Sequence, residues 1–355
     1  MGINQMTKYE SVAAKLTAYI NDSNTKSRKL PTERDLCQIY NVSRQTIREA
    51  LLLLEEDHLI TKVQGSGIYI DETYFASRNK IAIILKEEDE YIYPEWILLF
   101  KKALKQEGYM PEFFFTHNKS SLERKILNQI SNTPLRGIIA EPVKSIFNCP
   151  NEALYESLRQ KGIPTVFFMD NYSNMPSYPY IKYDDYSGSY SVTKNICSFK
   201  ETVYAVFLTD DNIGKNRYEG FLQSILDNGY EIDENRICLI SESDIVLIRK
   251  HLQPDKLPAF ISNIKNGHII CQDDEIAFYI YKHISDKDIH NVHIYSFDQS
   301  YLMKLCENKI ISYAPDKELL IHETVIGIIS LIQNKTFISK QLNPCIHEAT
   351  YPESF

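Results

Sequence analysis

The stretch from residue 42 to residue 51 reads VSRQTIREAL. Its apolar residues repeat at helical spacing and share one side of a helix: Ile47, Ala50, Leu51 and, one turn later, Leu54. Arg44 and Arg48 lie one turn apart toward the other side. Ser43 is a typical N-cap residue. The stretch therefore predicts a helix that runs to about Asp57, buries one face and presents two arginines on the other.

The neighbouring segments predict two more helices and a hairpin. Apolar residues recur at helical spacing from residue 9 to residue 20. Thr32 and Asp35 stand in the positions of a capping box at the start of a short second helix, which ends before a three-residue turn. Two β-prone runs follow the third helix, at residues 59–63 and 67–70, around a glycine turn. This order predicts a helix-turn-helix followed by a hairpin.

Charge supports a nucleic-acid interpretation of this module. The chain is acidic overall, with a net charge of −8, but residues 26–48 hold six basic residues and two acidic ones. An arginine fork matches the major-groove acceptors of guanine, and Gln45 can pair with adenine. Ser43 and Thr46 are hydroxyl residues near a helix start, where phosphate binds readily. A plain three-helix bundle with a solvated arginine face is the alternative.

Residues 8–70 resemble the N-terminal winged helix-turn-helix of GntR-type bacterial regulators. The resemblance rests on KLPTERDL at residues 29–36, on VSRQTIREAL, and on QGSG at residues 64–67. It implies that double-stranded operator DNA is contacted by Arg34, Ser43, Arg44, Gln45, Thr46 and Arg48, and that the wing glycine Gly65 approaches the minor groove. For Gly65 a plain hairpin turn is the other interpretation. Residues 21–29 depart from that family because they lack its usual glycines.

The texture of the sequence changes at about residue 80. Apolar runs of strand length alternate with amphipathic segments; the runs are 81–85, 137–140, 164–169, 204–208, 268–271 and 292–297. Such strands, separated by helices, are typical of parallel α/β sheets covered on both faces. They are too many for one small sheet, so two lobes are predicted. The polar segment 71–79, without periodicity, predicts a linker between an N-terminal domain (1–70) and a large domain (80–355).

The large domain resembles the periplasmic-binding-protein-like effector domain of LacI-type repressors. The matching segments are IAII at 81–84, RGII at 136–139, GIPTV at 162–166, YDDYSG at 183–188, RYEGF at 217–221, QDDEIA at 272–277 and YSFD at 295–298. The resemblance implies one lobe from 80–184 with 314–341, and another from 185–313 with the C-terminal strand. The combination of a GntR-type DNA-binding domain with a LacI-type effector domain resembles bacterial sugar regulators of the arabinose-repressor type.

The resemblance also implies a sugar-binding cleft between the lobes. Sugar hydroxyls both donate and accept hydrogen bonds, so a cleft for them needs charged planar groups and an aromatic side chain. The residues carried over to this cleft are Arg217, Asp273, Asp298, Asp170 at the lobe crossover, and Trp96 near the mouth. Two departures concern the identity of the sugar: Asp273 stands where the family often has asparagine, and Tyr279 where it has glycine.

Three of these residues have plainer interpretations as well. Trp96 could serve packing alone. Asp298 could cap a strand end. Arg217 could form a surface ion pair with Glu219 or Asp211.

These features favour a DNA-binding transcriptional regulator, most simply a repressor. It would bind its operator as a homodimer and respond to a pentose, a deoxyhexose or a derivative of one. No cofactor is predicted. The absence of a run of 18 apolar residues and of a basic-then-apolar leader predicts a cytoplasmic protein without membrane contact. Seven scattered cysteines without a CxxC fit a reducing compartment.

Other classes of protein remain open. A sugar-modifying enzyme with a DNA-binding module is one, although the sequence has no GxSxG, HExxH, P-loop or GxGxxG motif. A DNA-architectural protein is another, but it would not need a large acidic α/β body. His290 and His293 could be drawn as metal ligands; with no third histidine at a matching spacing, no metal site is predicted.

Overall fold

Side-chain caps decide where the N-terminal helices begin. The computed structural model describes residues 7–21, 27–133, 135–285, 291–306, 309–343 and 347–348. Thr32 and Asp35 form the predicted capping box of helix α2 (Glu33–Tyr40). Ser43 accepts a hydrogen bond from the Thr46 backbone and caps helix α3 (Arg44–Glu56). Asn41, between them, takes the left-handed conformation that ends α2.

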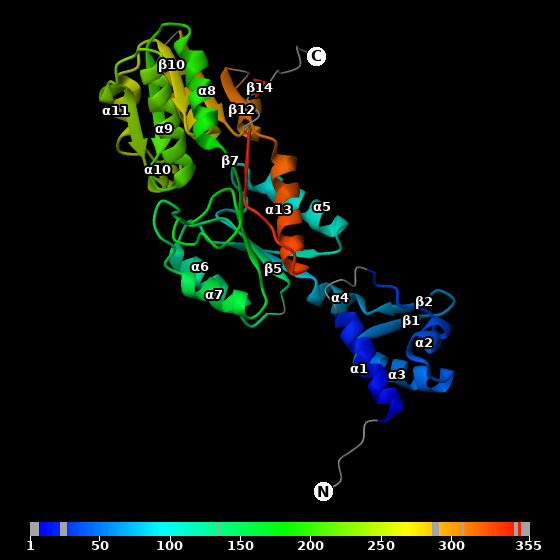
Figure 1. Cartoon of the computed structure of the whole chain (residues 1–355). Coiled ribbons are helices and arrows are strands. Elements are labelled where there is room, and N and C mark those ends of the chain that lie inside the picture. The colour runs from blue at the N-terminus through cyan, green and yellow to red at the C-terminus, as the bar shows by residue number, and fades with distance from the viewer. Residues whose placement is uncertain are drawn as a thin grey trace.

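Helix α1 (Lys8–Asn21) and the hairpin of β1 (Ile60–Val63) and β2 (Gly67–Ile70) complete the N-terminal domain (Figure 1). One apolar core joins these elements; its fully buried members include Leu16, Ile20, Leu36, Ile47, Leu51 and Leu54. Gly65, at the tip of the hairpin, has a φ of +75°, a region that favours glycine.

The segment predicted as a linker without periodicity contains a helix, α4 (Glu72–Arg78). Asp71 starts it by accepting hydrogen bonds from the backbones of Thr73 and Tyr74. Tyr74 and Phe75 pack against the core of the N-terminal domain. Two aromatic contacts and one cap therefore give order to a stretch whose sequence pattern is too short to predict it.

The first lobe is a six-stranded parallel sheet in the order β13-β7-β6-β5-β3-β4. Its strands are β3 (Lys80–Leu85), β4 (Met110–Phe115), β5 (Gly137–Ala140), β6 (Thr165–Phe168), β7 (Tyr180–Tyr183) and β13 (Lys340–Leu342). Alternate residues of β3 face opposite layers. Ile81 and Ile83 belong to the core that includes residues of α5 (Tyr93–Gln106) and α13 (Lys317–Ile332). Ala82 and Ile84 belong to the core that includes residues of α6 (Ser120–Ile130) and α7 (Glu152–Gln160).

The second lobe has a six-stranded sheet in the order β14-β12-β11-β10-β8-β9, parallel except at β14. Its strands are β8 (Val203–Leu208), β9 (Ile237–Ile240), β10 (Gly267–Cys271), β11 (Val292–Phe297), β12 (Ile310–Ala314) and β14 (His347–Glu348). Its α-helices are α8 (Asp185–Cys197), α9 (Asn212–Asp227), α10 (Glu242–Arg249), α11 (Leu257–Ser262) and α12 (Asp274–Ser285). Two short 3-10 helices, η1 (Glu234–Arg236) and η2 (Tyr301–Leu305), precede β9 and β12.

The chain passes between the two sheets after β7, after β12 and after β13, so neither lobe is continuous in sequence (Figure 1). The two-lobed α/β fold with parallel sheets is as predicted. Among the described residues, no helix has both the length and the apolar character needed to cross a membrane.

Candidate functional site

The two arginines of helix α3 share one carboxylate. Glu33 accepts a hydrogen bond from Arg44 Nε at 3.0 Å and another from Arg48 Nε at 3.2 Å. The arginine side chains stay 69% and 53% exposed, whereas that of Glu33 is 25% exposed. Because Glu33 lies in the first turn of α2, the preceding helix fixes the direction of both guanidinium groups. Their outer N–H edges remain open to a base or a phosphate.

The other residues predicted to contact DNA lie on or beside this face. Arg34 is exposed in the first turn of α2. The Ser43 and Thr46 hydroxyls lie 2.9 Å apart at the start of α3. Gln45 donates to Glu49 at 3.0 Å. A Cβ added at Gly65 would meet nothing within 4 Å, so nothing in the described chain covers the tip of the hairpin.

A cavity of about 80 Å³ lies between the two lobes. Trp96, Arg217, Asp273 and Asp298 line it, as the resemblance implies. Asp170 lies outside the lining and instead accepts a hydrogen bond from the Asn212 side chain of the second lobe at 3.2 Å. The structure therefore brings four of the five predicted cleft residues together and places the fifth at a contact between the lobes.

Arg217 is the most constrained group in the cleft. It donates to Asp185 at 2.9 Å, to Asp298 at 3.3 Å and to the Gln272 backbone carbonyl. Its guanidinium carbon lies 4.4 Å from the ring centroid of Phe297. Burial alone would lower the pKa of Arg217, but the two carboxylates raise it, so the side chain stays charged. These partners replace the surface pairs with Glu219 or Asp211 left open by the sequence.

Close packing of two helices makes this arrangement possible. Gly220 lies one turn after Arg217 on α9, and a Cβ there would lie 2.3 Å from the Tyr186 carbonyl oxygen on α8. Glycine therefore lets α9 approach α8 closely enough for Arg217 to reach Asp185. Phe221 and Ile225 bury the inner face of α9, whereas Leu226 is 52% exposed.

Two aspartates of the cleft differ in their surroundings. Asp298 directly follows β11 with a φ of +92°, a strained conformation of the kind that often marks functional sites. It accepts a hydrogen bond from Tyr91 Oη at 2.8 Å, so it does more than cap a strand. Asp273 accepts a hydrogen bond from the Ile276 backbone. Burial raises the pKa of Asp273 well above its usual range, which favours a protonated carboxyl that can donate to a ligand.

Two further polar atoms on lining residues are buried without a hydrogen-bond partner among the described residues. They are Trp96 Nε1, a donor, and Gln272 Oε1, an acceptor. Trp96 also packs edge-on against Tyr93 and Phe168. Unpaired buried polar atoms are costly, and a hydroxyl ligand could satisfy both kinds. Trp96 thus serves packing and also offers a donor.

Ion pairs join the lobes around the cavity. Lys86, at the end of β3, lies 3.5 Å from Glu141 in its own lobe and 3.7 Å from Asp211 in the other. Burial would lower the pKa of Lys86, but Glu141 and Asp211 raise it. Together with the Tyr91–Asp298 bond, this pair holds the two lobes in contact.

Arg249 makes the second ionic link between the lobes. From the end of α10 it binds Glu275 through two N–H groups at 2.7 and 2.8 Å. It also reaches Glu90 of the first lobe at 2.8 Å and Glu87 at 3.5 Å. One cation thus draws two carboxylates of the opposite lobe toward its own.

Several residues of the cleft and of the helix α3 face are not among the site residues predicted from the sequence. A signal exists for Lys86 and Glu141, since each directly follows a predicted parallel strand and the carboxyl ends of such strands line ligand sites. Glu33 is visible as an acid inside the basic segment. Nothing local identifies Tyr91 or Asp185, whose partners are 207 and 32 residues away.

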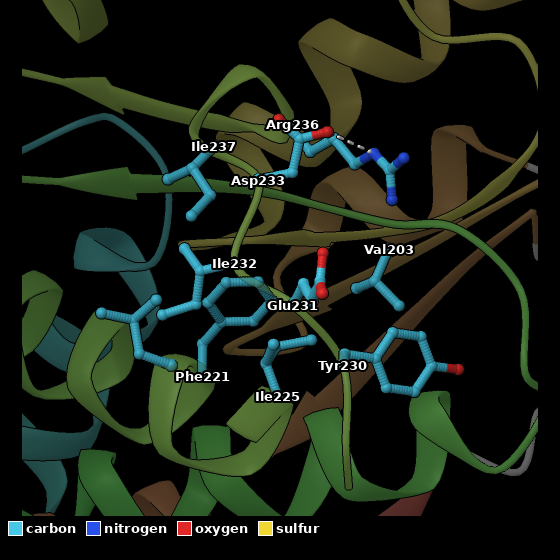
Figure 2. A pocket seen from close by; sticks show the side chains of 10 residues that line it. Val203, Phe221, Ile225, Tyr230, Glu231, Ile232, Asp233, Arg236 and Ile237 are labelled. Carbon is cyan, nitrogen blue, oxygen red and sulfur yellow. Dashed lines mark ion pairs between the residues drawn. The ribbon is translucent and has the colours of Figure 1, made fainter. Parts of the chain in front are cut away.

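Two other features lie outside the cleft. A gap of about 20 Å³ lies under the loop before β9, walled by apolar residues such as Phe221, Ile225 and Ile232, with Arg236 paired to Asp233 at its edge (Figure 2). Its volume suits one water-sized molecule. His293 stacks on His268 at 5.1 Å, and His290 lies outside the described residues. Within the described ranges, no three side chains of the metal-binding types converge.

Parts of this chain are similar to known proteins. Residues 8–70 match the family model of bacterial regulatory proteins of the gntR family. The arabinose metabolism transcriptional repressor of Halalkalibacterium halodurans is 27% identical over 321 residues, covering 86% of this chain and 84% of that protein. The protein of the same name from Geobacillus stearothermophilus is 25% identical over 342 residues, 93% of each chain.

A solved structure shares the fold of the large domain. It is a periplasmic binding protein/LacI transcriptional regulator from Alkaliphilus metalliredigens in complex with D-xylulofuranose. The TM-score is 0.63 at 16% identity, over 75% of this chain and 95% of that one. The chain thus carries a winged helix-turn-helix domain of the gntR family of bacterial regulatory proteins on a two-lobed domain with the fold of LacI-type regulators.

Proposed function

We propose that the protein is a transcriptional repressor that binds operator DNA and releases it when a sugar occupies the cleft. One observation carries this proposal. A single chain joins an exposed arginine pair on a gntR-type helix to a cleft with unpaired buried donors and acceptors. The names of the two relatives, which match over most of their length, support both repression and a pentose as effector. Operator binding implies a cytoplasmic protein.

Charge around the cleft favours a sugar without a phosphate group. Three basic side chains line the cavity, and each already pairs with carboxylates. Seven acidic side chains line it as well: Glu87, Glu141, Asp211, Glu242, Asp273, Glu275 and Asp298. A phosphate would meet repulsion there, and no lining cation of the described chain is free to offset it. Neutral hydroxyls can donate to the carboxylates instead.

A homodimer follows from the proposed operator binding, because symmetric operators carry two half-sites. Helices α5 and α13 of the first lobe offer a surface for the second copy. Leu98 on α5 is 66% exposed, and Leu319 and Ile326 on α13 are 41% and 40% exposed. Sedimentation of the full chain tests this, and a monomer at operator-saturating concentration would contradict it.

A thermal-shift screen of the full chain tests the effector. Pentoses, deoxyhexoses and their phosphates are compared, and a sugar at about 100 times its dissociation constant adds roughly 2.7 kcal/mol of stability. The sugar that stabilises the protein should then release it from operator DNA in a gel-shift titration. Stabilisation by the phosphates alone would contradict the assignment of a free sugar, and a sugar that binds without releasing DNA would contradict the regulatory role.

The alternative of a sugar-modifying enzyme makes a different prediction. A repressor returns its effector unchanged, whereas an enzyme converts it. Incubation of the full chain with the stabilising sugar, followed by chromatography, distinguishes the two. Recovery of the intact sugar is expected.

A further inference from the structure

A second cavity lies beside the cleft and is much larger, about 610 Å³ against about 80 Å³. Its volume falls within the range of about 300–1,000 Å³ that small-molecule sites occupy. The first lobe contributes residues 89–91, after β3. The second lobe contributes the end of α10, one side of α12 and η2. We call this space the lateral cavity.

Aromatic and apolar side chains form much of the wall of the lateral cavity. Phe278 and Tyr279 come from α12, and Leu302 from η2. Tyr279 and Leu302 are buried, and Phe278 is partly buried. The Tyr279 ring lies 4.1 Å from that of His283, and its hydroxyl is buried without a hydrogen-bond partner among the described residues. Flat aromatic rings suit such a wall, because they bury much apolar area and stack on other rings.

Charge on the two sides of the lateral cavity is uneven. Arg249 forms ion pairs with several carboxylates, including Glu90 of the first lobe and Glu275 of the second, which also line the cavity. Lys282 pairs with no carboxylate in the described part of the chain, and its ammonium lies 4.5 Å from the Phe278 ring centroid. His251 and His283 line the same, second-lobe side. Against them stands Asp89 of the first lobe, the one lining acid without an ion pair among the described residues.

We propose that the lateral cavity binds an aromatic carboxylic acid, with its ring against Phe278, Tyr279 and Leu302 and its carboxylate beside Lys282. Lys282, which pairs with no carboxylate of the described chain, attracts an anion, and the wall accommodates a ring. This is a second effector site, separate from the proposed sugar site.

The two sites share walls, so their ligands should influence each other. Tyr91, Arg249 and Glu275 line both cavities, and Tyr91 also bonds Asp298 in the cleft. Because the lateral cavity draws on both lobes, it keeps its shape only while they are closed. An acid bound there stabilises the closed form, and by linkage it raises the affinity of the cleft for its own ligand.

Isothermal titration of the full chain with 4-hydroxybenzoate tests the proposal without sugar or DNA. Saturable binding at a single site is expected. Lys282→Gln should weaken it by at least about tenfold, because a charge-assisted bond is lost. Leu302→Trp, which puts an indole into the space proposed for the ring of the acid, should also weaken it by at least about tenfold. Lys304→Gln is the matched control. Lys304 is exposed on η2, which also carries Leu302, but it does not line the cavity, so binding should be unchanged.

The proposal is overturned by any of three results. The wild type could show no saturable binding at millimolar 4-hydroxybenzoate. The uncharged 4-hydroxybenzyl alcohol could bind equally well, which would remove the role of Lys282. Lys282→Gln, an exposed substitution that leaves the core untouched, could bind like the wild type. Direct titration does not involve the operator, so failure here leaves the proposed sugar response standing.

Discussion

Arg217 lies between Asp185 and Asp298, and all three side chains are buried. Its replacement by alanine leaves two buried carboxylates without their cation, which costs about 3–5 kcal/mol of stability as well as ligand contacts. Arg217→Lys is the sharper test, because it keeps the charge but loses the planar fork. We expect this variant to fold and to bind the sugar at least about tenfold more weakly, with operator binding intact.

The measurement is operator release by sugar, with thermal unfolding alongside. Arg236→Ala serves as the control, because Arg236 makes an exposed pair with Asp233 (Figure 2) and neither residue lines the cleft. It should respond to sugar like the wild type. Release of Arg217→Lys at the wild-type sugar concentration would show that the fork does not serve the ligand.

Arg44 and Arg48 present their outer guanidinium edges to solvent, so each can bind a base. Replacing either by alanine should cost about 1–3 kcal/mol of binding to the operator and much less on random DNA. Fluorescence anisotropy with both DNAs measures the two losses. Equal losses would show that the arginines contact phosphates instead of bases.

Glu33 orients the guanidinium groups of Arg44 and Arg48. We therefore expect it to govern the sequence specificity of DNA binding, although its own negative charge is repelled by DNA. Glu33→Gln removes a negative charge and loosens both guanidinium groups. We expect random-DNA binding to strengthen and the ratio of operator to random affinity to fall. Glu55→Gln removes the same charge from a pair with Lys62 elsewhere in the domain, and it should leave that ratio unchanged. If Glu33→Gln left the ratio of operator to random-DNA affinity unchanged, Glu33 would not orient the arginines for base contacts.

At the scale of elements, the sequence predicts what local chemistry decides. The capping box at Thr32 and the N-cap at Ser43 act within one turn, so the bounds of α2 and α3 can be predicted closely. Helix α4 depends on aromatic contacts with the N-terminal core, which no short pattern encodes. Strand β4 contains Pro111, a residue that normally disrupts strands. The proline is tolerated because β4 lies at the edge of its sheet.

Because α4 packs on the N-terminal core, we expect the unit that folds alone to extend to about residue 79 and not to end at residue 70. A fragment of residues 1–79 should unfold at a higher temperature than one of residues 1–70, because Tyr74 and Phe75 bury apolar area. It should bind operator more weakly than the full chain, since we propose that the dimer contacts lie in the large domain. Circular dichroism and anisotropy measure both properties. Operator affinity equal to that of the full chain would contradict dimerisation through the large domain.

At the scale of the whole molecule, closure of the lobes should depend on pH. Glu242 faces Lys86, Arg249, Asp211 and Glu275, and burial raises its pKa from 4.5 to about 7 despite the two cations. Opening rehydrates it and returns the pKa toward 4.5, so protonation favours the closed form as pH falls through 7. The sugar concentration for half-release should therefore fall by up to about tenfold from about pH 8 to about pH 6.

Glu242→Gln cannot titrate and should remove most of this dependence. Operator release is titrated with sugar at several pH values for both proteins. A wild type with no change across the range, or a variant with the same change, would exclude Glu242 as the group responsible.

The contacts in the cleft show which features of the site can be predicted from the sequence and which cannot. The resemblance places Arg217, Asp273 and Asp298 on the cavity because each belongs to a short recognisable motif. The contacts across the cleft depend on how the lobes meet: Tyr91 reaches Asp298, and Arg249 reaches Glu90. Contacts between lobes leave no periodic signal in the chain, so they appear only when the fold is complete.

The interleaving of the lobes has a consequence for synthesis on the ribosome. The first sheet is complete only with β13 at residues 340–342, and the second only with β14 at 347–348. The N-terminal domain, with α4, ends at about residue 79, and we expect it to fold without the rest of the chain. At about 5–20 residues per second, it can fold roughly 15–50 s before either lobe can close. Each new molecule is therefore able to find DNA before it is able to sense its effector.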